Sequence, residues 1–256
     1  MDDSIPSADR EIEMTQFVAG VDGCPAGWIA VLHPFDNRSQ AELKLFRNFS
    51  ELLAFTPEPN PIAIDIPIGL SSVVAVGGRN ADRAARAVLG GRQSSIFAMP
   101  SRAAVMCSTY QEACEMALAT SAPPRKVSKQ AFHLFPKIRE VDALMTPGMQ
   151  ERIYECHPEV AFWALNGETA LDLPKKVKSR PSRPGLELRR NLLRSAGYSP
   201  ELLDDSRFPR KSVGPDDIID ACVNAWSAGR ILAGQARRFP DVPDVDERGL
   251  RMEIWG

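Results

Sequence analysis

The sequence predicts an α/β protein whose sheet starts with three antiparallel strands and continues with parallel ones. Three short apolar runs joined by turn-forming residues follow residue 16, which is typical of an antiparallel meander. A nearly continuous apolar run comes after a short helix, as a parallel strand covered on both faces requires. Much of the remaining chain has helical spacing of its apolar residues. At 256 residues, the chain can form one large domain with a substantial core.

The first three strands are expected at Phe17–Val21, Trp28–His33 and Ala41–Phe46, where apolar residues lie between glycine, proline and asparagine turns. Ser50 is a suitable cap for a short helix over Glu51–Phe55, because its hydroxyl can accept a hydrogen bond from the first turn. The order up to this point is therefore three strands and one helix.

The fourth strand is expected beside the first, over an apolar run that only Asp65 interrupts. It spans Ile62–Ile66. Helical spacing then predicts helices over Arg79–Gly90, Arg102–Thr120 and Ser128–Met145. Pro136 lies inside the third helix and is expected to kink or split it. These helices form an insert at about residues 79–150, within a single domain that covers residues 17–256.

After the insert, the pattern predicts one more strand and three more helices. The strand spans Arg152–Cys156, and the helices span Glu159–Leu165, Leu186–Ala196 and Asp216–Ala233. Lys175–Pro184 is expected to be a basic loop interrupted by proline, and the tail beyond Pro240 is expected to be irregular until Met252–Trp255. Residues 1–16 are polar and acidic, without a signal sequence, and are expected to be a flexible leader.

Composition excludes several functional classes. The formal net charge of −2 argues against a surface coated in basic residues for nucleic acid, although a local basic patch is still compatible with it. No apolar run approaches the roughly 20 residues that span a bilayer, so no membrane partner is expected. The five cysteines are odd in number and form no C-x-x-C pair, which favours a reduced, cytoplasmic protein. The oligomeric state stays open, a homodimer included.

Five carboxylates are placed where predicted strands and helices begin or end. Asp22 follows the first strand, Asp65 lies in the fourth, and Glu155 ends the strand after the insert. Asp217 and Asp220 are three residues apart and share one helix face. Because parallel strands end at the edge where α/β sheets bind ligands, all five are expected to converge there.

Converging carboxylates repel one another unless cations neutralise them, and hard oxygen ligands suit Mg²⁺ or Mn²⁺. Two such ions, roughly 4 Å apart, can activate water and stabilise the leaving oxygen of a phosphodiester. The pattern therefore predicts metal-dependent phosphodiester hydrolysis. Each residue also has a structural interpretation: Asp22 could form a turn, Glu155 could pair with an arginine, and Asp217 could cap its helix, leaving Asp220 functional.

The motifs around these carboxylates resemble the domain of unknown function 429 family, a group of predicted RNase H-like nucleases. The matching segments are Gly20–Trp28, Asp65–Leu70, Arg79–Arg86, Ser94–Arg102, Glu155–Glu159 and Asp217–Ala221. The resemblance implies an RNase H-like mixed sheet, with three antiparallel strands, then two parallel strands, helices on both faces and a helical insert. It also implies a metal site of Asp22, Asp65, Glu155, Asp217 and Asp220, by analogy with Holliday-junction resolvases.

Other residues are candidates for accessory roles. Near a metal, His157 could move a proton and Glu159 could support a ligand, although both also suit a structural strand-to-helix turn. Arginines of one predicted helix face and of its flanks could clamp phosphates, with a salt-bridged helix as the alternative. The face carries Arg79, Arg83 and Arg86, and Arg92 and Arg102 flank the segment that follows. The basic loop could follow a nucleic-acid backbone or simply be a charged surface. Its candidate contacts are Lys175, Lys176, Lys178, Arg180 and Arg183.

Two other functional classes compete with a nuclease. Actin-like or sugar-kinase-like phosphotransferases also place an Asp-Gly turn after a strand, but they duplicate the fold, and this chain shows no second Val21-Asp22-Gly23 turn. A non-catalytic nucleic-acid-binding protein would use the basic loop without needing a metal. ATP-dependent thermal stabilisation would support the phosphotransferase, and the absence of a bound divalent ion by calorimetry would favour the binding protein.

Overall fold

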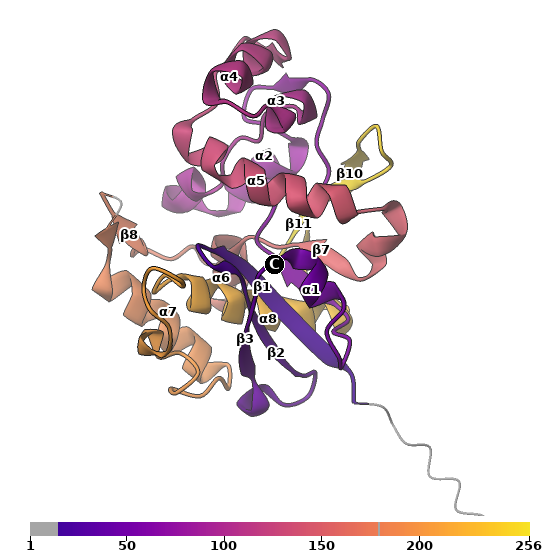
Figure 1. Cartoon of the computed structure of the whole chain (residues 1–256). Helices are drawn as coiled ribbons and strands as arrows, with labels where there is room; N and C mark the ends of the chain where they lie inside the picture. Colours follow the sequence, from indigo (N-terminus) through magenta and orange to yellow (C-terminus); the bar gives the residue numbers. More distant parts are fainter. Residues whose placement is uncertain (1–14, 179) are drawn as a thin grey trace, which may run out of the picture.

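The computed structural model describes residues 15–178 and 180–256. Most of the predicted flexible leader, residues 1–14, lies outside the described residues. Within the described part, the protein is an α/β fold around one mixed sheet, with helices on both of its faces (Figure 1).

The sheet has five strands in the order β3-β2-β1-β4-β7. Their bounds are Phe17–Cys24 for β1, Gly27–Pro34 for β2, Glu42–Phe46 for β3, Ile62–Ile64 for β4 and Ile153–Glu155 for β7. The first three strands are antiparallel neighbours, and β4 runs parallel to both β1 and β7. The predicted meander and the predicted position of the fourth strand beside the first are therefore confirmed.

Eight helices surround the sheet among the described residues. They are α1 (Phe49–Leu53), α2 (Asn80–Val88), α3 (Arg102–Met106), α4 (Tyr110–Ala119), α5 (Lys129–Leu144), α6 (Pro158–Leu165), α7 (Arg183–Ser195) and α8 (Asp217–Leu232). Alternating residues of β1 face opposite sides: Val21 belongs to the same buried cluster as Phe135 of α5, whereas Val18 belongs to the cluster that contains Ile219 of α8. The insert with α2 to α5 lies beyond one edge of the sheet (Figure 1).

Gly20 allows α8 to lie directly on β1. A Cβ atom at this position would stand 1.8 Å from the backbone nitrogen of Ala225 and 2.2 Å from the backbone oxygen of Ala221. Because both neighbours are helix backbone, the clash cannot be relieved by rotating a side chain. The close approach brings the first turns of α8 to the end of β1, where Asp22 lies.

We expect Gly20→Ala to lower the free energy of unfolding by about 1–3 kcal/mol, because it overpacks the contact between α8 and β1. Urea denaturation followed by circular dichroism measures the loss. Gly148→Ala is the matched control, since an added Cβ there meets nothing within 4 Å. Equal stability of the two variants would show that α8 can move away from β1 without penalty.

The structure corrects two predictions about the helices in this part of the chain. Asn48, and not Ser50, caps α1, because its side-chain oxygen accepts a hydrogen bond from the backbone N–H of Glu51 at 3.0 Å. The predicted helix Arg102–Thr120 is two helices, because Thr109 caps a new start at α4 together with Glu112. At Pro136, where a kink or a split is expected, the α5 helix does not split.

The prediction of an irregular tail beyond Pro240 is also wrong, because this segment forms a hairpin. Its strands are β10 (Arg238–Val245) and β11 (Arg251–Trp255). Prolines and a register shift between Phe239 and Asp244 hide the alternation of β10 from the sequence. The basic loop likewise contains a short hairpin, β8 (Lys176–Val177) with β9 (Arg180–Pro181), and a further small sheet joins β5 (Val74–Ala75) to β6 (Ser121–Ala122).

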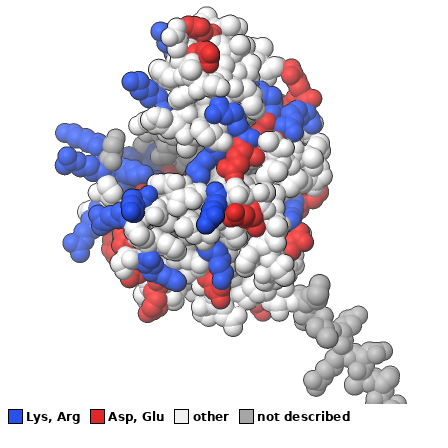
Figure 2. Space-filling view, viewed as in Figure 1, with Lys and Arg blue, Asp and Glu red and all other residues white. Residues whose placement is uncertain are grey.

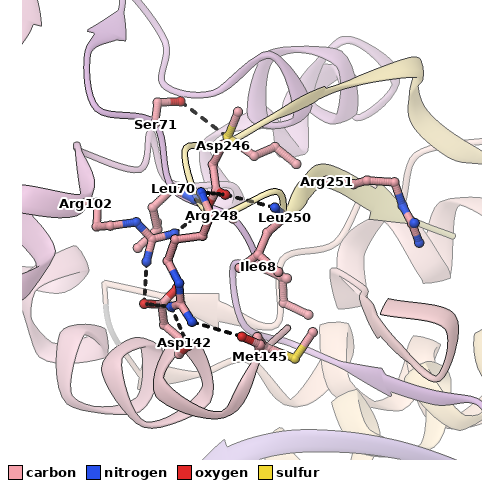
Figure 3. A network of polar contacts seen from close by, with 12 residues as sticks. Ile68, Leu70, Ser71, Arg102, Asp142, Met145, Asp246, Arg248, Leu250 and Arg251 are labelled. Carbon is pink, nitrogen blue, oxygen red and sulfur yellow. Dashed lines mark hydrogen bonds and ion pairs between the residues drawn. The ribbon is translucent and has the colours of Figure 1, made fainter. Parts of the chain in front are cut away.

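A network of ion pairs attaches the turn of the C-terminal hairpin to the insert (Figure 3). Arg102 of α3 forms ion pairs with Asp142 of α5 and with Asp246 between β10 and β11. Arg248 pairs with Asp142 at 2.8 Å, and Asp246 accepts the backbone N–H of Leu70 at 3.0 Å. Arg102 is therefore part of the framework that holds the insert beside the sheet.

Candidate active site

Asp22 and Asp65 lie next to each other at the edge where the parallel strands end. Val21 of β1 is the register partner of Ile64 of β4, and the backbone N–H of Asp65 donates to the carbonyl oxygen of Val21 at 3.0 Å. Asp22 belongs to the strand itself, whereas Asp65 follows β4 directly, one residue beyond its end. The parallel pairing of β1 and β4 therefore brings the two carboxylates together at this edge of the sheet.

The first turns of α8 lie close to the same edge. Asn224 is fully buried, and its side-chain amide donates to the carbonyl oxygen of Val21 at 3.0 Å, which fixes α8 against β1. Asp220, one turn earlier, is buried, and its Oδ1 atom has no hydrogen-bond partner. Asp217 accepts the backbone N–H of Gly214 at 2.7 Å, so it stabilises the turn that leads into α8.

A cleft of about 530 Å³ opens at this edge. Asp22, Asp65 and Glu155 are part of its lining, and α5 contributes His133 and Lys137. Segment 92–97 and the start of the β8–β9 hairpin complete the lining. The insert therefore forms a wall of the cleft, facing the ends of the strands. Lys and Arg side chains project at the left of Figure 2, where Figure 1 places the hairpin.

Glu155 lies at this edge but is held by an arginine. Both of its carboxylate oxygens accept hydrogen bonds from Arg79, at 2.5 Å and 2.8 Å, and one also accepts the backbone N–H of Ile68 at 2.7 Å. Arg79 also binds Asp82 at 2.7 Å, and all three side chains are buried. Glu155 therefore makes the contacts expected of a structural residue, because it pairs with an arginine.

The two neighbours of Glu155 in the motif also have structural contacts. His157 caps α6, its Nδ1 atom accepting the backbone N–H of Glu159 at 3.2 Å, and its other nitrogen lies 3.3 Å from the carbonyl oxygen of Ser95. Burial lowers the pKa of His157 to about 4, so its ring is neutral at pH 7. Glu159 binds the fully buried Arg189 through both oxygens, at 2.6 Å and 2.8 Å.

Lys175 connects the cleft with the acidic start of α8. Its ammonium group forms an ion pair with Asp220 and lies 3.8 Å from Asp216, while Lys176 pairs with Asp216 at 2.6 Å. Lys175 also lines the cleft together with Asp22 and Asp65. The first residues of the basic loop therefore point into the candidate site.

Burial and mutual repulsion raise the pKa of three carboxylates at the site. Burial raises the pKa of Asp22 well above its usual range, and repulsion from Asp65 and Asp220 adds to this. Burial also raises the pKa of Asp65 to about 8 and that of Asp220 to about 6, although the charge of Lys175 opposes both shifts. A cation at this edge would relieve the repulsion.

We expect the metal-free protein to become less stable as the pH rises from about 5 to about 9. The raised pKa values of Asp22, Asp65 and Asp220 mean that the folded state binds protons more tightly than the unfolded chain, so the stability is lost as the pH passes the folded pKa values. Urea denaturation in EDTA measures this decline. It should be shallower in Asp65→Asn and unchanged in Asp172→Asn, an exposed site. A stability that rises throughout this range would contradict the shifts.

The remaining predicted accessory residues lie outside the lining of the cleft. Arg83 and Arg86 donate to the backbone oxygens of Gly78 and Gly77, at 2.6 Å and 2.7 Å, so their guanidinium groups support the insert. Figure 3 places Arg102 in the network with Asp142 and Asp246. The other candidates from the basic loop are exposed at the surface, namely Lys178, Arg180 and Arg183.

Sequence reasoning missed the contacts that three cations make at or near the site. Arg79 and Arg189 pair with Glu155 and Glu159, and Lys137 lines the cleft beside Gly23, the residue after Asp22. The Lys137 ammonium group donates to the carbonyl oxygen of Gly27 at 2.5 Å and lies 4.2 Å above the ring of Trp28. The signal for the first two was available, because carboxylates inside apolar segments require buried cations.

The donor set fits a divalent metal in its chemistry. Asp22 and Asp65 offer hard oxygen ligands, and the unpartnered Oδ1 atom of Asp220 is a further oxygen close by. Within residues 15–178 and 180–256, however, no three His, Cys, Asp or Glu side chains are gathered tightly enough to hold an ion as they stand. Binding would therefore require these side chains to shift toward the ion.

Fold and site together define an α/β protein with an acidic cleft at the parallel edge of a mixed sheet. A family model described as Protein of unknown function (DUF429) matches residues 20–245, so the chain belongs to this family, as its motifs predicted. No curated protein and no solved structure matches the chain. All five cysteines are free, and none of the described helices is long and apolar enough to cross a membrane.

Proposed function

We propose that the protein is a divalent-metal-dependent nuclease or related phosphodiesterase with an RNase H-like fold. One observation carries the proposal: Asp22 and Asp65 come from neighbouring parallel strands, and they are the carboxylates of the cleft lining that form no ion pair among the described residues. Carboxylates kept together and without a cationic partner, despite their mutual repulsion, are typical of a metal site.

The arrangement of the sheet supports the RNase H-like part of the proposal. The resemblance stated above implies three antiparallel strands followed by two parallel ones, and the observed order β3-β2-β1-β4-β7 has this arrangement. The carboxylates lie at the strand ends and at the last long helix, α8, as expected for the same superfamily. The fold supports a carboxylate metal site at the strand ends, whereas the choice of substrate depends on the residues that line the cleft.

Each residue of the cleft has a role in the proposed reaction. Asp22 and Asp65 bind Mg²⁺ or Mn²⁺, while Glu155, held by Arg79, keeps the neighbouring strand end in place. When bound, the ion supplies a Lewis acid that polarises the phosphodiester and makes water more acidic. Lys137 and Arg92 line the cleft and bind phosphate oxygens, which neutralises their charge and orients the scissile bond.

Hydrolysis of labelled DNA and RNA oligonucleotides, single-stranded and double-stranded, tests the proposal. We expect cleavage with Mg²⁺ or Mn²⁺ and none in EDTA. Binding of oligonucleotides without cleavage and without any effect of metal would instead support the non-catalytic binding protein. ATP-dependent thermal stabilisation without nuclease activity would support the phosphotransferase.

A further inference from the structure

Some carboxylates around the cleft have a cationic partner, whereas others have none. Arg79 pairs with both Glu155 and Asp82, and Arg189 pairs with Glu159, so each of these three acids has a cationic partner. Asp22 and Asp65 form no ion pair among the described residues. Asp220 is the only one of the five predicted metal ligands that pairs with a lysine in the described part of the chain, and that lysine is Lys175.

Lys175 is placed by the backbone around it, unlike a surface lysine whose side chain happens to reach an acid. Its carbonyl oxygen accepts the backbone N–H of Ser182 at 2.8 Å, which closes the base of the β8–β9 hairpin. Gly185 of α7 lies against the preceding residue, so closely that an added Cβ would stand 1.9 Å from the carbonyl oxygen of Pro174. Both contacts direct the Lys175 side chain inward, where 24% of it stays exposed.

The ammonium group of Lys175 lies between two sets of acids. On one side are Asp220 and Asp216 of the α8 start, and on the other is the cleft with Asp22 and Asp65. A second divalent ion, bridging α8 to the strand ends, would have to occupy the same region. Two cations repel strongly at such short range in a partly buried site, so lysine and a second ion exclude each other.

We propose that the site takes a single divalent ion at Asp22 and Asp65, and that the Lys175 ammonium group serves as the second cation by holding Asp220. The inference rests on the proposed function, and it puts one ion and a lysine where converging carboxylates could otherwise hold two ions. Lys175 is then a positioning residue, which keeps Asp220 neutralised and leaves the cleft face of the ion open to substrate.

Removing the lysine charge should therefore create a second metal site. In Lys175→Met the side-chain length is kept, but Asp220 loses its partner, so its Oδ2 atom is released and joins Oδ1, which already has no partner. An uncompensated buried carboxylate is costly, so a divalent ion would bind it. The single substitution Asp220→Asn removes the negative charge that Lys175 compensates, so this variant should still bind one ion.

The experiment counts bound ions in the full chain. Mn²⁺ titrations followed by calorimetry and electron paramagnetic resonance should give one ion for the unaltered protein and two, with a coupled spectrum, for Lys175→Met. Lys175→Met combined with Asp220→Asn should return the number to one. Lys178→Met, on an exposed residue of the same hairpin, is the matched control and should keep one ion.

Each result decides between the proposals. Two ions in the unaltered protein would overturn the role of Lys175 and leave the proposed nuclease intact. No ion in the unaltered protein would overturn both. One ion in Lys175→Met, with circular dichroism unchanged, would show that Lys175 does not take the place of a cation. If that variant fails to fold, two ions in Lys175→Gln would support the inference, and one ion there would overturn it.

Discussion

Replacing Asp22 or Asp65 with asparagine is expected to abolish metal-dependent hydrolysis and to weaken Mn²⁺ binding by more than about 10–100-fold. That range is the usual effect of losing a residue that only supports a metal ligand, so losing a ligand itself should exceed it. Asparagine keeps the size and one oxygen of the side chain but removes its charge. Calorimetric titration with Mn²⁺ and cleavage of labelled oligonucleotides measure the two effects separately.

The same substitutions are expected to leave the metal-free protein at least as stable at pH 8. Burial and mutual repulsion raise the pKa of both carboxylates, so neutral side chains relieve an unfavourable charge in the folded state. This distinguishes a lost ligand from a misfolded protein. Asp172→Asn serves as control for both measurements, since Asp172 is exposed and outside the lining of the cleft. Hydrolysis that persists in both Asp22→Asn and Asp65→Asn would remove these residues from the site.

The positions of Asp22 and Asp65 could be predicted because they depend on strands. An apolar run ending in Asp-Gly and another interrupted by one aspartate are local patterns, and parallel pairing of the two strands brings their ends together. The meander and the parallel strands were predictable for the same reason. The hairpin of β10 and β11 was not, because its prolines and its register shift interrupt the alternation on which the prediction depends.

The partners of the other acids could not be predicted in this way. Arg79 is 76 residues from Glu155, and Lys175 is 45 residues from Asp220, so no spacing rule connects them. Arg79 also precedes α2 and so stands outside the helical face that Arg83 and Arg86 were expected to share with it. The sequence indicates that buried acids need cations, but only the packing of the insert decides which cations reach them.

Arg79→Met is expected to lower the free energy of unfolding by about 3–5 kcal/mol, the usual effect of breaking a buried ion pair from one side. The substitution keeps much of the apolar stem but leaves two buried carboxylates, Glu155 and Asp82, without their cation. It also removes hydrogen bonds to the carbonyl oxygens of Ile68 and Gly69, at 3.0 Å and 3.1 Å. Urea denaturation in EDTA measures the loss.

Arg83→Met is the matched control, because Arg83 is exposed on the following helix and donates to a single backbone oxygen. Its effect should stay within about 0.5 kcal/mol. Glu155→Gln distinguishes the two interpretations of Glu155. If the carboxylate serves Arg79, this variant loses stability while its Mn²⁺ affinity stays near that of the unaltered protein. A large loss of Mn²⁺ affinity without a loss of stability would instead make Glu155 a metal ligand, and Arg79 would then be the group that releases it when the ion binds.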